Sequence, residues 1–315
     1  MMKILKTNDT TRKLEEVKVI EKGVWINLYK PTKEELAFVT DKTGVDKILL
    51  EYALDIEETS HIDTEDDQVL ISVNVPILEK VAKRKTYTTL PLGMIIVRDD
   101  YFITISTEKL DILEKVTTEK LILGEFSTYK KSRIIFQVLY KTSEDYIRYL
   151  ALVNKDIEKF EEKIEKNMKN QELAHLISFQ KTMIYFDTAL KSNQTVMERL
   201  KRGKIIKLYE EDEDILEDAT IENRQAMEMV TTYSDILNGM IDVFGTMISN
   251  NLNTVMKFLT SITIIIAIPT LIASVMGMNV TFPFATTDKG FYIVMLVSVM
   301  VTSISTWFLS KKDML

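Results

Sequence analysis

FLTSITIIIAIPTLIASVM, at residues 258–276, is a run of nineteen residues without a charged side chain. A second run, FYIVMLVSVMVTSISTWFLS at residues 291–310, continues for twenty residues without a charge. At 1.5 Å per residue, each run forms a helix roughly 28–30 Å long, which matches the hydrocarbon core of a bilayer. Core helices of globular proteins carry charges on one face, and these runs do not. We therefore predict two C-terminal transmembrane helices joined as a hairpin.

The lysines around the two runs predict their orientation. Lys257 precedes the first run, Lys311 and Lys312 follow the second, and the linker between them contains only Lys289. Positive charge is enriched in cytoplasmic loops. We therefore expect both termini in the cytoplasm and the linker outside a cell (inner) membrane. The N-terminal part contains no apolar segment of signal-peptide length, which agrees with this orientation.

Composition excludes several classes of function. The 315-residue chain has a formal net charge of -7 and no cysteine, and its only histidines are His61 and His175. An acidic chain without a basic cluster lacks the surplus of Lys and Arg that nucleic-acid binding needs. Without cysteine there is no disulfide, thiolate zinc site or cysteine nucleophile. No glycine-rich phosphate loop or nucleophile–base set is recognisable, so we expect neither an enzyme nor a bound cofactor.

The N-terminal part, residues 1–140, has the pattern of an α/β domain. Segments rich in β-branched and aromatic residues predict strands at 23–28, 68–77, 92–97 and 101–106. Arg98, Asp99 and Asp100 predict a hairpin turn between the last two strands. Pro31, followed by acidic residues, predicts the start of a helix.

The remainder of the soluble part predicts long helices. Thr142 or Ser143 is a candidate N-cap, and apolar residues then recur at helical spacing for more than fifty residues, until Gly203. A second helical segment starts near Asp212 and contains no proline before Pro269. We therefore expect this helix to continue without interruption into the first apolar run.

A polar stripe follows this second helix at alternating spacings of three and four residues. The stripe consists of Asp235, Gly239, Asp242, Thr246, Ser249, Asn253, Met256, Thr260, Thr263, Ala267, Thr270, Ser274 and Gly277. A two-stranded coiled coil requires Leu, Ile or Val at such positions. Polar side chains at membrane depth face protein or water, so several copies of this helix around an axis would enclose a polar lumen. The alternative is that the small residues only permit close helix packing.

The sequence Gly277-Met278-Asn279, directly after the first apolar run, resembles the signature of the CorA family of magnesium transporters. Asn253, Met256, Leu259 and Thr270 occur at the spacing of that family, and the layout of the whole chain is similar to it. In the N-terminal half, WINL (25–28), PTKEEL (31–36) and ALDIEE (53–58) are also similar to family segments.

The resemblance implies a homopentamer in which the first membrane helices line a pore for divalent cations. The pore would conduct Mg²⁺ into the cell, with Co²⁺ and Ni²⁺ as further candidate ions. Asn279, with Gly277 and Met278, would form the outer mouth, and Thr270 and Asn253 would provide further rings of oxygen atoms. Mg²⁺ keeps several of its waters, and neutral oxygen acceptors bind those waters without removing them.

The resemblance also implies a gate and a regulatory site. Met256 and Leu259 would form an apolar constriction, and Asp242 would concentrate cations at the inner mouth. Asp218 matches the stalk position of a regulatory Mg²⁺ site between subunits, for which Glu79 is a candidate partner. The acidic block at 210–218 would then sense cytoplasmic Mg²⁺, although such blocks also occur as simple solvated faces.

One departure from the family pattern bears on the alternatives that remain open. The outer loop lacks the acidic stretch of many members, since its acid, Asp288, neighbours Lys289. A zinc transporter on the same scaffold and a non-conducting, membrane-anchored coiled-coil scaffold are the alternatives. The expected partners are further copies of the chain, membrane lipid and divalent metal ions, with no nucleic acid.

The fold class that these arguments predict is an α+β membrane protein with an N-terminal α/β domain, a long stalk helix and two C-terminal transmembrane helices. The expected divisions are a cytoplasmic α/β domain at 1–140, long cytoplasmic helices at 141–210, a stalk helix at 211–257, the pore-lining first transmembrane helix at 258–279, an external loop at 280–290, the second transmembrane helix at 291–310, and a basic tail at 311–315.

Overall fold

The fold was determined as a computed structural model, which describes residues 1–8, 10–81, 84–118, 127–164, 170–203, 205–279, 288–312 and 314. The chain forms two compact units, Met1–Leu237 and Asn238–Leu315. The strands are β1 (Met2–Thr7), β2 (Leu14–Glu16), β3 (Trp25–Tyr29), β4 (His61–Glu65), β5 (Gln68–Val81), β6 (Arg84–Val97) and β7 (Tyr101–Ser106). The helices are α1 (Lys33–Thr43), α2 (Lys47–Tyr52), α3 (Asp111–Thr118), α4 (Lys131–Ile164), α5 (Asn170–Lys201), α6 (Glu210–Met276) and α7 (Asp288–Lys311).

The first unit is built on a seven-stranded sheet in the order β2-β1-β3-β7-β6-β5-β4. Neighbouring strands are antiparallel except β3 and β7, which are parallel. The four predicted strands are confirmed as β3, β5, β6 and β7. The prediction missed β1, β2 and β4, which lie toward the two edges of the sheet, where short and partly polar strands carry a weaker pattern.

The predicted turn between β6 and β7 is confirmed. Val97 pairs with Tyr101, and the Asp100 amide donates to the Val97 carbonyl at 2.9 Å. Arg98 and Asp99 adopt positive φ angles of 48° and 52°. Such angles match the right-handed twist of a hairpin, and Asp tolerates them better than most residues do.

The predicted helix start near Pro31 is also confirmed. Thr32 caps α1, and the Glu35 amide donates to the Thr32 hydroxyl at 3.2 Å. The Thr32 amide in turn donates to the Glu35 carboxylate at 2.9 Å, which completes a capping box. Gly44 ends the helix with a φ of 72°, a left-handed conformation that glycine adopts without strain.

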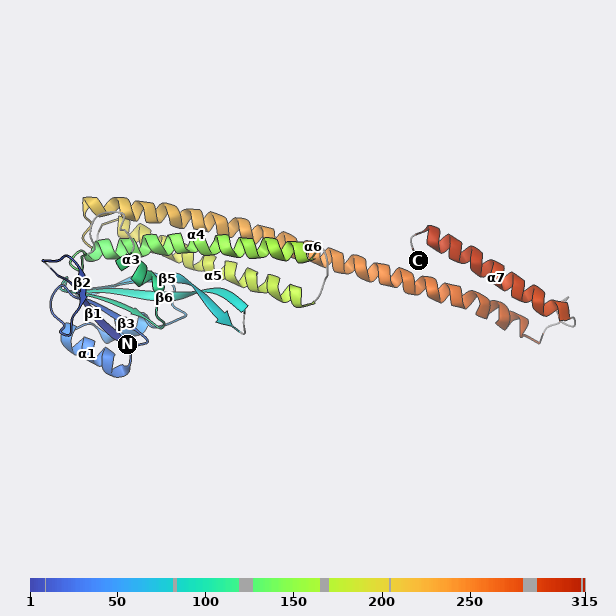
Figure 1. The fold of residues 1–315 in the computed structure, drawn as a ribbon, viewed down its shortest axis with the longest axis horizontal. Helices are drawn as coiled ribbons and strands as arrows, with labels where there is room; N and C mark the ends of the chain where they lie inside the picture. Colours follow the sequence, from blue (N-terminus) through green and yellow to red (C-terminus); the bar gives the residue numbers. More distant parts are fainter. Residues whose placement is uncertain are drawn as a thin grey trace. The chain divides into compact units, whose positions relative to one another are not determined.

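The sheet has helices on both faces (Figure 1). Because side chains alternate along a strand, Ile71 faces the core that contains α4 and α5 side chains, while the preceding Leu70 faces the core below α1 and α2. The long helices therefore cover one face of the sheet, and the short helices α1 and α2 cover the other.

The start of α4 corrects one prediction. The helix begins at Lys131, well before Thr142 and Ser143, and neither residue caps it. Both hydroxyls are buried and donate one turn back, from Thr142 to the Val138 carbonyl at 2.7 Å and from Ser143 to the Leu139 carbonyl at 3.1 Å. The polar residues were mistaken for a cap because they interrupt the apolar pattern, which in fact continues from residue 134.

The stretch of more than fifty residues after Ser143 belongs to two helices, α4 and α5, and residues 165–169 between them lie outside the described part of the chain. The predicted stop is confirmed, because α5 ends at Lys201 and Gly203 has a φ of 67°. The second long helix is confirmed as α6, which spans 67 residues and includes Pro269.

The second unit contains the C-terminal part of α6 and the helix α7. Both helices include a window apolar enough to span a membrane, with mean hydropathies of 2.2 and 1.9, and only 6% of each window is buried. A core helix of a soluble protein would be largely buried. The exposed apolar surface therefore supports the assignment of both segments as membrane helices. Residues 280–287 of the predicted external loop lie outside the described part.

Candidate pore and metal sites

The polar stripe of the second unit lies on an exposed part of α6. Asp242, Thr246, Asn253, Thr260 and Thr270 are all exposed in the single chain. Among the described residues of the unit, none covers the stripe, so its side chains are available to a neighbouring molecule or to water.

Threonine hydroxyls on this stripe share one geometry. Thr246 donates to the Asp242 carbonyl at 3.0 Å, Thr263 to the Leu259 carbonyl at 2.8 Å and Thr270 to the Ile266 carbonyl at 2.8 Å. Each hydroxyl has one proton, and that proton is committed to the helix backbone. The oxygen lone pairs that remain can only accept. These three positions of the stripe therefore present hydrogen-bond acceptors, which suits the water shell of a cation.

The segment Gly277-Met278-Asn279 follows the end of α6 at Met276. The Gly277 amide still donates to the Ala273 carbonyl at 3.0 Å, and its φ lies outside the left-handed region. A Cβ at Gly277 would lie 3.4 Å from the Ala273 oxygen. The backbone conformation at Gly277 is therefore one that other residues also adopt. Within one chain, an alanine side chain would fit at this position after a small adjustment.

Met278 and Asn279 are both exposed at this end of the helix. Within the described residues, the carboxamide of Asn279 has no hydrogen-bond partner, so its oxygen is available as an acceptor. Asn279 also does not adopt the left-handed conformation typical of a helix-terminal asparagine. Its local structure therefore gives no reason for asparagine at this position.

Met256 and Leu259, the predicted gate, expose 58% and 56% of their surfaces. They lie three residues apart on α6, so both side chains belong to neighbouring faces of one turn. Large apolar side chains exposed to this extent contribute little to the stability of the isolated chain. Packing partners for Met256 and Leu259 would have to come from outside the isolated chain.

Asp218 and Glu79, the predicted regulatory pair, are both exposed in the first unit. No group of three or more acidic or histidine side chains that could hold a metal occurs among the described residues. Glu79 borders a cleft of about 430 Å³ together with Asp111 and Asp145. Asp145 is already neutralised by Lys115 at 2.7 Å and Arg148 at 2.8 Å. One chain alone therefore supplies no complete metal site at either residue.

The acidic block at the start of α6 divides into two kinds of residue. Asp212 is buried, and its Oδ1 accepts from Nε of Arg133 at 2.6 Å, while Glu211 accepts from Nη2 of Arg133 at 2.7 Å. Burial opposes the charged form of Arg133, but these hydrogen bonds outweigh it and raise the pKa of the guanidinium. The hydrogen bond from Arg133 also lowers the pKa of Glu211. The prediction missed this role, because Arg133 is distant in sequence and carries no motif.

Glu213, Asp214, Glu217 and Asp218 remain exposed on the same segment. Glu217 lies 3.8 Å from Lys201, a distance at which an exposed pair contributes little. These exposed carboxylates, together with that of Glu210, can meet a cation, whereas the buried Asp212 cannot.

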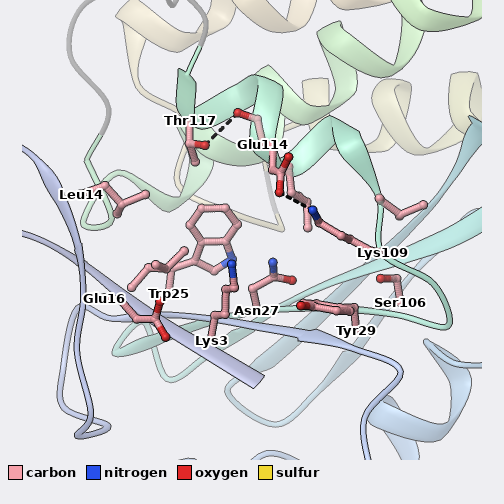
Figure 2. A pocket seen from close by; sticks show the side chains of 13 residues that line it. Lys3, Leu14, Glu16, Trp25, Asn27, Tyr29, Ser106, Lys109, Glu114 and Thr117 are labelled. Atoms are coloured by element: carbon pink, nitrogen blue, oxygen red, sulfur yellow. Dashed lines mark hydrogen bonds and ion pairs between the residues drawn. The ribbon is translucent and has the colours of Figure 1, made fainter. Parts of the chain in front are cut away.

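A small cavity of about 180 Å³ lies between α3 and the sheet, beside Trp25 and Lys3 (Figure 2). Trp25 donates from Nε1 to the Thr104 hydroxyl at 2.8 Å, and Lys109 forms an ion pair with Glu114 at 2.6 Å. Ligand pockets usually enclose about 300–1,000 Å³. With its size and its paired charges, this cavity is a packing feature and not a candidate ligand site.

Comparison with known proteins identifies the class to which this fold and stripe belong. The family described as "CorA-like Mg2+ transporter protein" matches residues 21–312. The chain belongs to this family.

Among curated proteins, the chain is 28% identical over 298 residues to the cobalt/magnesium transport protein CorA of Methanocaldococcus jannaschii, covering 91% of this chain and 90% of the relative. The CorA protein of Thermotoga maritima is 24% identical over 183 residues, covering 58% of this chain and 52% of the relative. By their names, both relatives are transport proteins.

Among solved structures, the complete CorA magnesium transporter of M. jannaschii superposes with a TM-score of 0.82 at 24% identity, covering 98% of this chain and 96% of that structure. The cytoplasmic domain of ZntB from Vibrio parahaemolyticus superposes with a TM-score of 0.59 at 12% identity, covering 80% of this chain and 97% of that structure. These similarities establish the fold, with an N-terminal α/β domain, a long helix and a second apolar helix.

Proposed function

We propose that the protein is a channel through which Mg²⁺, and also Co²⁺ or Ni²⁺, enters the cell, and that it is not an enzyme. The observation that carries this proposal is the stripe of exposed polar side chains along α6. The stripe continues into an apolar segment that the described residues of the unit leave largely exposed. Exposed hydroxyl and carboxamide groups in a membrane are costly unless they face protein or water. A water-filled lumen satisfies them and at the same time offers a path for a hydrated ion.

A single α6 cannot enclose a lumen, so the proposal includes a ring of identical chains. Family membership favours a homopentamer in which α6 lines the pore and α7 faces lipid. The apolar side chains on α7, of which Tyr292, Met295 and Leu296 are more than half exposed, then contact the bilayer. The positions of the lysines support a cell (inner) membrane location with both termini in the cytoplasm. A negative interior would then favour entry of cations.

At the outer mouth, Asn279 would accept hydrogen bonds from the waters of Mg²⁺. Mg²⁺ dehydrates reluctantly, so a site that binds the hydrated ion captures it without the cost of removing water. Neutral acceptors also bind loosely enough to release the ion into the pore. Gly277 and Met278 would set the position of this ring. Thr270 and Asn253 would repeat the same chemistry deeper in the pore, and both carry oxygens that accept hydrogen bonds.

Toward the cytoplasmic side, Met256 and Leu259 would close the pore by excluding water from an apolar ring. Asp242 would concentrate cations beyond this ring. Cytoplasmic Mg²⁺ bound between subunits near Asp218, with Glu79 as a candidate partner, would hold the closed state. The exposed carboxylates of the acidic block support this role, because bound cations would relieve their repulsion across a subunit interface.

The experiment that tests the proposal is uptake of Mg²⁺ into liposomes that contain the full-length protein and a trapped fluorescent indicator. We expect uptake by the parent protein and strongly reduced uptake by Asn279→Ala. The matched control is Asn251→Ala, because Asn251 is equally exposed on α6 but lies off the stripe.

Three other results of the uptake experiment would contradict parts of the proposal. Equal loss in both variants would contradict a specific role for Asn279. No uptake by an oligomeric parent protein would contradict the channel and favour a membrane-anchored scaffold. Uptake of Zn²⁺ in preference to Mg²⁺ would identify a zinc transporter on the same scaffold.

A further inference from the structure

The C-terminal end of α7 places two ammonium groups over two aromatic rings. Nζ of Lys311 lies 5.4 Å from the centroid of the Trp307 ring, and Nζ of Lys312 lies 5.0 Å from that of Phe308. Trp307 and Phe308 expose 65% and 51% of their surfaces, so both rings are available to the surrounding medium. Aromatic rings of this kind concentrate at the boundary between hydrocarbon and headgroups, and long lysine side chains extend from there toward water.

The chain after α7 turns back onto α6 and fixes the position of this end. The amides of Lys312 and Met314 donate to the Leu309 carbonyl at 3.1 and 3.2 Å. The Met314 carbonyl then accepts from the hydroxyl of Ser261 at 2.7 Å, and Ser261 is fully buried by the packing around it. The end of α7 is therefore attached to α6 at a defined level.

Lys257 lies one helical turn before Ser261 on α6, a rise of about 6 Å. The bond between Ser261 and Met314 therefore brings Lys257 within about one helical turn, along α6, of the segment that follows Lys311 and Lys312. Within the described residues, none of these three lysines forms an ion pair. From residue 243 to residue 312 the sequence contains one acid, Asp288, at the opposite end of α7, and Asp313 follows the two lysines. The three lysines thus form a basic cluster with an excess of positive charge.

We propose that Lys257, Lys311 and Lys312, with the ring of Trp307, bind the headgroup of an anionic phospholipid. The phosphodiester of such a lipid carries the negative charge that the cluster lacks, and its acyl chains continue along the exposed apolar side of α7. The ring of Trp307 holds the Lys311 ammonium by cation–π attraction at the depth where lipid phosphates lie. This inference depends on the membrane placement in the proposed function, but not on ion conduction.

Trp307 also makes the site measurable. The chain contains two tryptophans, and the other, Trp25, is buried in the core of the first unit. Full-length protein is reconstituted in mixed vesicles of phosphatidylcholine and phosphatidylglycerol in which one lipid at a time carries bromine atoms that quench tryptophan fluorescence. Quenching then reports which lipid occupies the surroundings of Trp307.

We expect brominated phosphatidylglycerol to quench more than brominated phosphatidylcholine at equal mole fraction. The attraction between one basic side chain and an anionic lipid surface corresponds to an enrichment of the anionic lipid beside that side chain of about fivefold. The double variant Lys311→Gln with Lys312→Gln should abolish the preference. Lys289→Gln should preserve it, because this control removes the same charge from the opposite end of α7.

Equal quenching by the two lipids in the parent protein would overturn the proposal, and so would a preference that survives in the double variant. If Lys289→Gln lost the preference for phosphatidylglycerol to the same extent, the preference would be a general effect of charge, and the proposal would also be overturned. Displacement by soluble glycerol phosphate would assign the site to free phosphate compounds. Absence of quenching by either lipid would instead contradict the membrane placement. Loss of Mg²⁺ uptake with an unchanged lipid preference would contradict only the channel.

Discussion

Arg133 at the start of α4 and Asp212 at the start of α6 form a buried ion pair, with 2.6 Å between Nε and Oδ1. Side-chain exposures of 7% and 2% show that neither group has appreciable contact with water. The Ser132 hydroxyl donates to the second oxygen of Asp212 at 3.2 Å. This arrangement joins the beginnings of two long helices that are distant in sequence.

Removing Arg133 leaves the Asp212 carboxylate buried without its counter-ion. We therefore predict that Arg133→Met destabilises the protein by about 3–5 kcal/mol, the range for breaking a buried pair. The change is measured by thermal unfolding of the detergent-solubilised protein. The control is Arg148→Met, because Arg148 is half exposed and its partner Asp145 keeps Lys115. A double variant with Asp212→Leu should recover much of the loss, and failure to do so would contradict the assignment of the loss to an unpaired charge.

The pKa of Glu211 predicts a pH dependence of stability. Its hydrogen bond from Arg133 lowers this pKa in the folded state. A carboxyl with a lowered folded pKa contributes stability above its unfolded pKa, and the contribution is lost as the pH falls through the folded value. Glu211→Gln should therefore reduce the loss of stability on acidification below about pH 4.5. Thermal unfolding across a pH series measures this. Glu213→Gln, at an exposed position, should follow the parent curve, and an identical effect of both changes would contradict the prediction.

The assignment of Met256 and Leu259 as the gate predicts that a smaller side chain there lets Mg²⁺ pass through the closed channel. Leu259→Ala shortens a proposed constriction residue and should weaken the exclusion of water. We expect Mg²⁺ uptake into liposomes to increase at internal Mg²⁺ concentrations that keep the parent channel closed. The matched control is Val243→Ala, which also shortens an exposed apolar side chain of α6, with 59% of its surface exposed, on a different face of the helix. A leak of the same size in both variants would indicate a general effect on the helix.

The sensor assignment predicts a change in regulation without a loss of conduction. Asp218→Lys places a positive charge where a cation is proposed to bind between subunits, so inhibition of uptake by internal Mg²⁺ should weaken. Glu228→Lys makes the same charge change at an exposed position of α6 outside the acidic block and should leave inhibition near that of the parent. Inhibition in both variants is measured as Mg²⁺ uptake into liposomes that contain different internal Mg²⁺ concentrations. If inhibition by Mg²⁺ stays unchanged in Asp218→Lys, Asp218 has no part in sensing.

Features that depend on residues close together in the chain could be predicted from the amino-acid sequence. The two apolar runs, the uninterrupted α6, the stop at Gly203 and the turn at Arg98 and Asp99 follow from local charge, periodicity and turn chemistry. The candidate pore residues also came from the sequence, because their spacing on one helix and the segment Gly277-Met278-Asn279 are linear patterns. Helical geometry converts such a pattern into a stripe without any tertiary contact.

Features that depend on partners distant in the chain became clear from the three-dimensional fold. The buried role of Asp212 required Arg133, and the position of Lys257 beside the end of α7 required the bond between Ser261 and Met314. Thr142 illustrates the same limit, because its hydroxyl has the chemistry of a cap and only packing shows that it donates within a continuing helix. A polar side chain has several possible partners, and burial selects among them because an unpaired polar group away from water is costly.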